Sequence, residues 1–184
     1  LHRQSGVKGE FVHVNCAAMP EQLFEAELFG VMAGAFTGAQ KDRPGKLELA
    51  NNGTLYLDEM DSLPLACQAK LLNALQYRGA TRLGGQSFYT SSFRVIASTK
   101  ACLPDLVVQQ KFREDLHFRL SVSQVRIPSL AERLEDILPL YRHFLAEVAA
   151  QFRLQVPALS AEECDELLSK PWPGNVRELH AVAQ

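Results

Sequence analysis

The chain has 184 residues, of which 47% are hydrophobic and 22% are charged, which excludes a disordered tail and a collagen-like repeat. The formal net charge of -2 gives no general attraction to nucleic acid. The cysteines show no paired C-x-x-C spacing, which disfavours a zinc site or a disulfide scaffold. No apolar run approaches the roughly 20 residues of a membrane span, so we expect a cytoplasmic protein with no membrane partner.

The first third of the chain alternates apolar runs with a helical pattern. Phe11–Val14 predicts a short strand, and Pro20–Phe29 predicts a helix that Gly30 ends. Residues 31–39 contain two glycines and follow neither a helical nor a strand period, so they predict an exposed loop. Thr54–Glu59 is an apolar run ending in two acids, which is typical of a strand buried on both faces with a polar site at its carboxyl end.

Further along, Pro64–Tyr77 predicts a helix and Phe93–Ser98 a second buried strand. Two such strands joined through a helix indicate a parallel sheet. Val122–Ile127 predicts another strand, after which the apolar spacing is that of a long helix. Pro128 interrupts the chain there, and we place the boundary between an α/β subdomain (1–128) and a helical subdomain (129–184) at this point.

Both ends of the chain predict a longer natural protein. The first residue is Leu1 rather than an initiator methionine, and Val176–Gln184 runs in a helical pattern without a stop signal. We therefore expect further segments on either side.

The acids at the end of the first buried strand are the first candidates for chemistry. Asp58 could hold Mg²⁺ through water and Glu59 could polarise an attacking water, as a nucleotide hydrolase requires. An isolated Asp-Glu pair more often caps the helix that follows. The rare string GAFTGA lies upstream at a loop-like position and shifts the preference from a helix cap towards a nucleotide hydrolase.

Seven segments, in order, resemble the central ATPase domain of bacterial sigma-54-dependent transcriptional activators, the enhancer-binding AAA+ proteins: FVHVNCAAMPEQLFEAELFG, GAFTGA, NGTLYLDEM, QAKLLNALQ, FRVIAST, FREDLHFRL and PWPGNVREL. The resemblance implies an α/β, AAA+ three-layer sandwich without its first strand and phosphate-binding loop, followed by a helical lid. It also implies ATP hydrolysis coupled to remodelling of the sigma-54 RNA polymerase holoenzyme. In this family GAFTGA forms the loop that engages sigma-54, here Gly34, Ala35, Phe36, Thr37, Gly38 and Ala39.

The resemblance also assigns roles around the nucleotide. Asp58 and Glu59 match the Walker B pair, with Asp58 on Mg²⁺ and Glu59 as base. Asn15 matches the polar partner of that glutamate, although a residue at a strand end could equally be a turn former. Thr99 matches the first sensor of the terminal phosphate and Arg177 the second.

Arg113 and Arg119 match the arginine fingers that a neighbouring subunit supplies, worth roughly 10³ to 10⁵ in rate. Fingers acting in trans imply a homo-oligomeric ring, with a hexamer as the expected form. The alternative is surface ion pairing, because Glu114 and Asp115 lie beside them.

Three features depart from the family pattern. Lys100 follows the sensor threonine where the family has Asn or His, and Ala131 replaces the first arginine of a PLRER string that retains Arg133. The string G-x-x-x-x-G-K-[ST] occurs nowhere in the chain. We therefore expect an ATPase only in a complete domain, with this chain alone inactive. The alternative function is a non-catalytic module that presents the GAFTGA loop. DNA would be contacted only through segments outside this chain.

Overall fold

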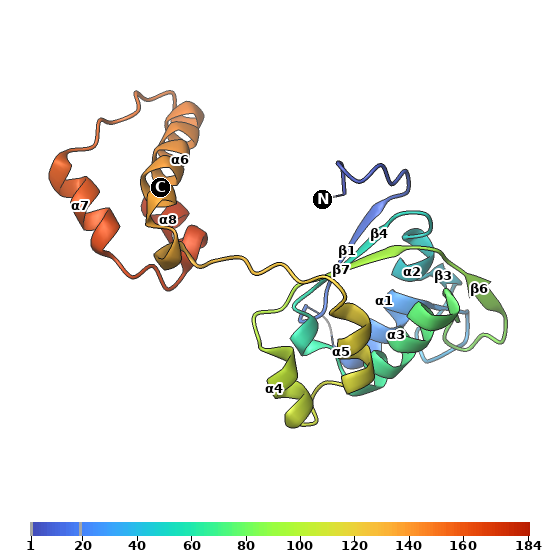
Figure 1. Cartoon of the computed structure of the whole chain (residues 1–184). Coiled ribbons are helices and arrows are strands. Elements are labelled where there is room, and N and C mark those ends of the chain that lie inside the picture. Colours follow the sequence, from blue (N-terminus) through green and yellow to red (C-terminus); the bar gives the residue numbers. More distant parts are fainter. Residues whose placement is uncertain (1, 19) are drawn as a thin grey trace. The chain divides into compact units, whose positions relative to one another are not determined.

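The computed structural model describes residues 2–18 and 20–184, which divide into two compact units. The first extends to Gln124 and contains the strands, and the second runs from Val125 to Gln184 and contains α6, α7 and α8 (Figure 1). The division lies ahead of Pro128, where the chain was expected to change from α/β to helical.

A three-stranded parallel sheet forms the centre of the first unit. Its strands are β1 (Phe11–Asn15), β4 (Thr54–Asp58) and β7 (Arg94–Ala97), in the order β1-β4-β7. The predicted parallel pairing of the two apolar runs is thus confirmed. In the register, Asn15 lies opposite Asp58, and Leu57 lies opposite Ala97. All three strands therefore end at the same edge of the sheet.

The core of the first unit lies on one face of this sheet. Val12, Val14, Leu55 and Leu57 are buried there with residues of α1 (Glu21–Phe29) and α3 (Leu65–Tyr77). The helical spacing predicted for both segments is confirmed, because it places apolar side chains at intervals that face the sheet.

The other face of the sheet is more open than the sequence suggests. His13 is exposed and Tyr56 and Ile96 are half-buried, and in the described part of the chain β7 contains no buried residue. The expectation that both strands are buried on both faces is wrong here. A parallel strand is buried on both faces only where helices cover both faces of the sheet, and the core of this unit lies on one face.

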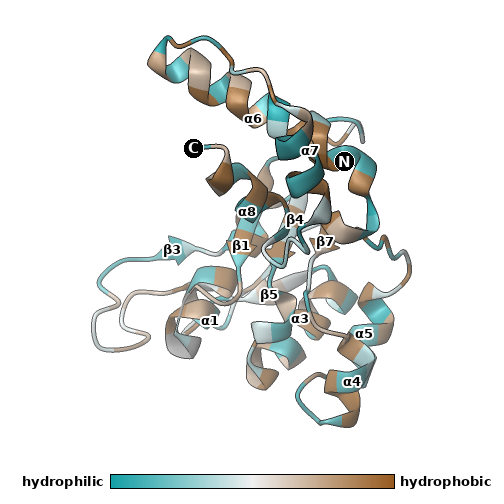
Figure 2. Cartoon of the chain, turned by 90° about the vertical axis from the view of Figure 1, so that its left-hand side faces the viewer, coloured by the Kyte–Doolittle hydropathy of each residue, from teal (hydrophilic) through white to brown (hydrophobic). Residues whose placement is uncertain are grey.

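Shorter elements complete the first unit. The loop after α1 extends away from the sheet (Figure 2) and is bounded by an antiparallel pair, β2 and β3. The remaining elements are β2 (Gly30–Val31), β3 (Arg43–Pro44), α2 (Lys46–Leu49), η1 (Met60–Ser62), β5 (Gly79–Thr81), β6 (Phe88–Thr90), α4 (Leu103–Val108) and α5 (Glu114–Leu120).

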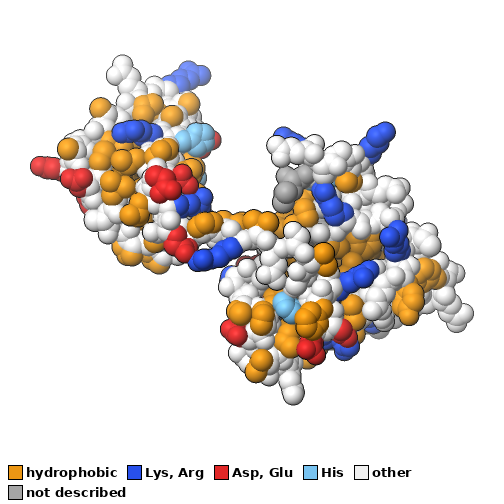
Figure 3. All heavy atoms as spheres, viewed as in Figure 1, with side chains coloured by type: hydrophobic (Ala, Val, Ile, Leu, Met, Phe, Trp, Pro, Cys, Tyr) orange, Lys and Arg blue, Asp and Glu red, His pale blue; other side chains and the backbone are white. Residues whose placement is uncertain are grey.

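The strand predicted over Val122–Ile127 is wrong. No part of this segment forms a strand, and Val122, Val125 and Ile127 are 86%, 83% and 79% exposed. Figure 3 shows apolar side chains along this connecting segment. A strand needs a neighbour for its backbone hydrogen bonds, and among residues 2–18 and 20–184 none pairs with these residues.

The second unit is a small helical bundle. Its helices are η2 (Leu130–Glu132), η3 (Leu134–Asp136), α6 (Ile137–Phe152), α7 (Ala161–Ser169) and α8 (Asn175–Val182). Trp172 is buried among Leu130, Ile137, Leu167 and Leu179, and its Nε1 donates a hydrogen bond to the Leu167 carbonyl over 2.8 Å. Within the described residues, no helix has the length and apolar content to cross a bilayer.

Candidate functional site

The carboxyl ends of the three parallel strands bring polar residues together. Asn15 ends β1, Asp58 ends β4 and Ser98 directly follows β7. The Ser98 N–H donates to the Leu57 carbonyl and the Met60 N–H donates to the Ser98 carbonyl, both over 2.9 Å. These bonds fix the ends of β4 and β7 side by side, at the edge where ligands bind in open α/β sheets.

One carboxylate oxygen of Asp58 carries most of the contacts. Oδ1 accepts hydrogen bonds from the Ser98 hydroxyl over 2.5 Å and from the Glu59 N–H over 3.1 Å, and the Tyr56 hydroxyl lies 3.2 Å away. Oδ2 lies 3.6 Å from Nε2 of His13. The hydrogen bond from Ser98 is the largest cause that lowers the pKa of Asp58 below its ordinary value, so this carboxyl is ionised at neutral pH.

Glu59 has a strained backbone. Its φ is 52° and its ψ is 50°, the left-handed region, which costs a residue with a Cβ roughly 1–2 kcal/mol. Strain of this kind concentrates at functional sites. The side chain is 36% exposed, and its Oε1 lies 3.9 Å from the Lys100 ammonium. Lys100, the residue that departs from the family pattern, is thus the cation beside Glu59.

Asn15 acts as a turn residue in this structure. Its Oδ1 accepts a hydrogen bond from the Ala17 N–H over 2.8 Å. This is the turn-forming behaviour considered above as the alternative to pairing with Glu59. The next residue, Cys16, is buried, and burial followed by the charge of Asp58 raises its pKa to about 12. Cys16 is therefore a neutral thiol and an unsuitable metal ligand.

The sensor threonine also has local partners. The Thr99 hydroxyl lies 2.9 Å from Asp61 Oδ1 and accepts the Ala101 N–H over 3.0 Å. It is exposed next to the end of β7, so it faces solvent at the same edge as Asp58.

A divalent cation fits the donor chemistry of this edge. Carboxylate oxygens are the ligands that Mg²⁺ prefers, and Oδ2 of Asp58 is the oxygen with the fewest contacts. In residues 2–18 and 20–184, no group of three or more His, Cys, Asp or Glu side chains could hold a metal ion. A cation here would therefore take most of its ligands from water or from a bound phosphate, as Mg²⁺ commonly does.

The GAFTGA segment forms a loop closed by its own backbone. The Gly34 N–H donates to the Ala39 carbonyl over 2.8 Å, and the Ala39 N–H donates to the Phe36 carbonyl over 3.0 Å. Gly34 and Gly38 have φ of +82° and +107°, which side chains with a Cβ rarely adopt. Phe36 is 41% exposed and Thr37 is exposed, as the sequence predicts for this loop.

The base of this loop is held by two other segments. The Met32 N–H donates to the Leu83 carbonyl, and the Leu83 N–H donates to the Gly30 carbonyl, both over 2.9 Å. Oδ1 of Asp42 accepts the Ala33 N–H over 2.8 Å. The loop thus stands on the β5–β6 hairpin with its tip free.

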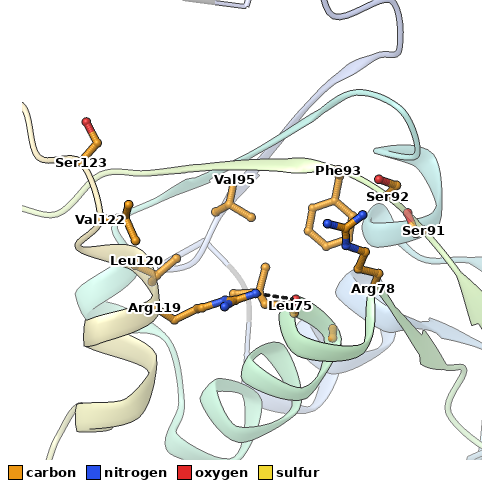
Figure 4. A pocket seen from close by; sticks show the side chains of 11 residues that line it. Leu75, Arg78, Ser91, Ser92, Phe93, Val95, Arg119, Leu120, Val122 and Ser123 are labelled. Carbon is orange, nitrogen blue, oxygen red and sulfur yellow. Dashed lines mark hydrogen bonds between the residues drawn. The ribbon is translucent and has the colours of Figure 1, made fainter.

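The two arginines of FREDLHFRL have different surroundings. Arg113 pairs with Asp115 through two hydrogen bonds of 3.0 and 2.7 Å, the surface ion pair anticipated as an alternative. Arg119 instead extends along a pocket of about 390 Å³ that Arg78, Phe93 and other residues line, and reaches the Leu75 carbonyl at 3.4 Å (Figure 4). Arg119 is exposed and its guanidinium makes this single long contact. Of the two, it is the freer to contact another molecule.

Arg177 lies in the first turns of α8 and is exposed. It belongs to the second unit. Nearby, Oδ1 of Asn175 accepts the Leu130 N–H over 2.7 Å, which joins the start of α8 to η2.

Three residues around Asp58 were missed by sequence reasoning. They are His13, Tyr56 and Ser98, which contribute an imidazole and two hydroxyl groups. The signal that could have revealed them is the strand period: Tyr56 precedes Asp58 by two residues, so both point to the same face. Ser98 follows Ala97, which is paired with Leu57, and therefore lies level with Asp58.

Comparison with known proteins shows the family of the chain. Residues 1–126 match the family described as the Sigma-54 interaction domain, and residues 131–184 match the AAA+ ATPase lid domain. The chain is 50% identical over 184 residues to the "Pathogenicity locus probable regulatory protein WtsA" of Pantoea stewartii subsp. stewartii, covering 100% of this chain and 57% of that protein. It is 47% identical over 185 residues to the "C4-dicarboxylate transport transcriptional regulatory protein DctD" of Rhizobium meliloti (strain 1021), covering 100% of this chain and 40% of that protein.

Solved structures of NtrX from Brucella abortus share the fold. The complex of NtrX with ADP superposes with a TM-score of 0.87 at 35% identity, and the complex with ATP with a TM-score of 0.86 at 35% identity. Each covers 95% of this chain and 38% of the NtrX chain. The parallel sheet with its helices and the C-terminal helical unit are therefore an AAA+ fold with its lid. The chain belongs to the sigma-54 interaction domain family of transcriptional regulators.

Proposed function

We propose that this domain, in its complete protein, couples ATP hydrolysis to remodelling of the sigma-54 RNA polymerase holoenzyme and so activates transcription. The observation that supports this most directly is the Gly34–Ala39 loop. It is closed by its own backbone and presents Phe36 and Thr37 to solvent. An exposed aromatic between two glycines is well suited to contact with a partner protein.

The edge of the sheet supplies the candidate hydrolytic groups. When bound, Mg²⁺ would neutralise charge on the phosphates. Asp58 would hold it through water, and Glu59 would orient the attacking water, with Lys100 beside it. Asn15 would become a partner of Glu59 after leaving its turn with Ala17. Thr99 and Arg177 are the proposed sensors of the nucleotide.

Nucleotide binding is supported by the solved structures of NtrX in complex with ADP and in complex with ATP. The chain has no G-x-x-x-x-G-K-[ST] string, whose backbone N–H groups and lysine would grip the phosphates. We therefore expect calorimetric titration of the 184-residue chain with ATP and Mg²⁺ to show no tight binding. Submicromolar affinity would contradict the need for that loop.

The loop assignment is tested by Thr37→Ala in the complete protein. ATP hydrolysis should stay close to the wild-type rate while polymerase activation is lost, because Thr37 is exposed at the loop tip. Gln151→Ala, an exposed position on α6, serves as the control and should leave both unchanged. If hydrolysis or folding falls as far as activation does, the loop does not have this role.

A homo-oligomeric ring, expected to be a hexamer, would let Arg113 and Arg119 act on the nucleotide of a neighbouring subunit. In the complete protein, Arg119→Ala should lower hydrolysis by roughly 10³ to 10⁵ with little change in nucleotide binding to the monomer. Mixing Arg119→Ala with Glu59→Gln subunits should restore part of the activity, since some interfaces then combine an intact Glu59 with an intact Arg119. Mixed rings without any recovery would exclude action across the interface.

The alternative function is a non-catalytic module that presents the loop without hydrolysis, which would be favoured if the complete protein lacked the phosphate-binding string. The two are separated by Glu59→Gln in the complete protein. Loss of both hydrolysis and activation supports the ATPase, whereas full activation by Glu59→Gln supports the module. In either case DNA would be contacted through segments outside this chain.

A further inference from the structure

The two oxygens of the Asp58 carboxylate have unequal surroundings. Oδ1 faces the hydroxyl groups of Ser98 and Tyr56 and the N–H of Glu59, at 2.5, 3.2 and 3.1 Å. Among the described residues, Oδ2 has one polar neighbour, Nε2 of His13, 3.6 Å away. Hydrogen bonds to a charged acceptor are short and strong, so Oδ1 is fully occupied and Oδ2 is left available.

Both hydroxyl groups stand on rigid supports. The backbone of Ser98 is bonded to residues that flank Asp58 in the sequence. Its N–H donates to the Leu57 carbonyl, and its carbonyl accepts from the Met60 N–H. The Tyr56 ring stacks on His13 with centroids 5.0 Å apart, and its hydroxyl lies 3.1 Å from the Ser98 hydroxyl. The arrangement can therefore keep Asp58 in one orientation without help from a ligand.

We propose that the hydroxyl groups of Ser98 and Tyr56 are positioning groups that occupy Oδ1 of Asp58 and so favour Mg²⁺ over Ca²⁺ at this edge. The inference rests on the proposed function, in which Asp58 faces the cation. Mg²⁺ dehydrates reluctantly, so it can keep its waters in an octahedron and be held through a water that needs only Oδ2 as acceptor. Ca²⁺ often takes both oxygens of one carboxylate, and here that would require Oδ1 to give up its donors.

The test uses the 184-residue chain and Mn²⁺ as the probe. Mn²⁺ at low concentration broadens the amide NMR signals of nearby residues, and the signals of Glu59 and Ser98 report binding at this edge. Separate competition titrations with Mg²⁺ and with Ca²⁺ give two midpoints. Their ratio is the readout, because a general loss of affinity would move both midpoints together and leave the ratio unchanged.

In the double variant Ser98→Ala/Tyr56→Phe, the Ca²⁺ midpoint should fall relative to the Mg²⁺ midpoint by about fivefold, the equivalent of roughly 1 kcal/mol. Ser98→Thr, which keeps a hydroxyl, should retain most of the wild-type ratio. Tyr77→Phe, which removes a hydroxyl from a ring 70% exposed at the end of α3, should not change it. Should the double variant fail to fold, Ser98→Ala alone should shift the ratio in the same direction.

Asp58→Asn separates this inference from the proposed function. If the broadening at Glu59 and Ser98 persists in Asp58→Asn, the assignment of Asp58 to the cation is wrong. If Asp58→Asn abolishes the broadening but the hydroxyl variants leave the ratio of midpoints at its wild-type value, Asp58 still faces the cation and the positioning role is overturned.

Discussion

The strand-end cluster, meaning Asn15, Asp58, Glu59 and Ser98, differs from the Gly34–Ala39 loop in how it is held. Ser98 and Asp58 are 40 positions apart in the chain, and their contact depends on the pairing of β4 with β7. The loop is closed by bonds between residues at most a few positions apart. The cluster therefore requires the folded core throughout, whereas the loop requires it only at its base, where Leu83 bonds to Gly30 and Met32, and closes its tip through its own backbone.

The two regions also reach left-handed backbone conformations differently. The loop uses glycine at Gly34 and Gly38, where a Cβ would meet open space. The cluster uses Glu59, whose side chain is needed for the proposed chemistry. Strain is thus avoided in the region proposed to contact a partner and retained in the region proposed to act on the nucleotide.

The largest expected effect comes from the core beneath the cluster. Leu57→Ala should lower the free energy of unfolding by about 2–5 kcal/mol, because Leu57 is fully buried and its removal leaves a cavity. Phe36→Ala in the loop should change it by no more than about 0.5 kcal/mol. Urea denaturation of the two variants gives both values. Similar losses of unfolding free energy in the two variants would contradict the difference between the regions.

A glycine pair sharpens the comparison further. A Cβ at Gly53 would lie 2.2 Å from the Glu10 carbonyl oxygen, between β1 and β4, so Gly53→Ala should cost about 3 kcal/mol of stability. A Cβ at Gly38 meets nothing within 4 Å, and Gly38→Ala should cost only about 1 kcal/mol through its positive φ. Thermal unfolding would detect both, and an equal cost would contradict the open surroundings of the loop.

The strain at Glu59 predicts an effect of opposite sign. Glu59→Gly should raise the free energy of unfolding by about 0.5–1 kcal/mol, because glycine adopts this φ without a Cβ clash, although the greater entropy of the unfolded glycine chain offsets part of the gain. Glu59→Ala, which keeps the Cβ, should show no such gain. A lower stability of Glu59→Gly in urea denaturation would show that the left-handed conformation is not strained.

A pH dependence of stability is expected at Asp58. Its pKa is lowered in the folded state, so its contribution is fully present above the unfolded pKa of about 3.9 and is lost as the pH falls through the folded value. Ser98→Ala should reduce stability by about 1 kcal/mol at pH 7, with the deficit shrinking below about pH 4. Denaturation of the wild type and of Ser98→Ala at a series of pH values measures this difference in stability. A difference that grows in acid would contradict its assignment to the lowered pKa of Asp58.

The sequence by itself determined the local elements of this protein and its family. Local sequence patterns predicted the strands at Phe11–Val14 and Thr54–Glu59 and the helix at Pro64–Tyr77, all of which the structure contains. Such patterns depend on neighbouring residues alone. The two glycines of the loop likewise predicted its irregular, exposed backbone. The order of motifs predicted the family that the comparisons show.

Only the tertiary structure decided what surrounds each candidate residue. The contacts of Asp58 with Tyr56 and Ser98, and of Glu59 with Lys100, depend on strand order and register. The failed strand at Val122–Ile127 has the same cause, since an apolar run becomes a strand only when another strand accepts its backbone hydrogen bonds. Periodicity specifies which face a residue occupies, whereas its partners are set by how distant segments pair.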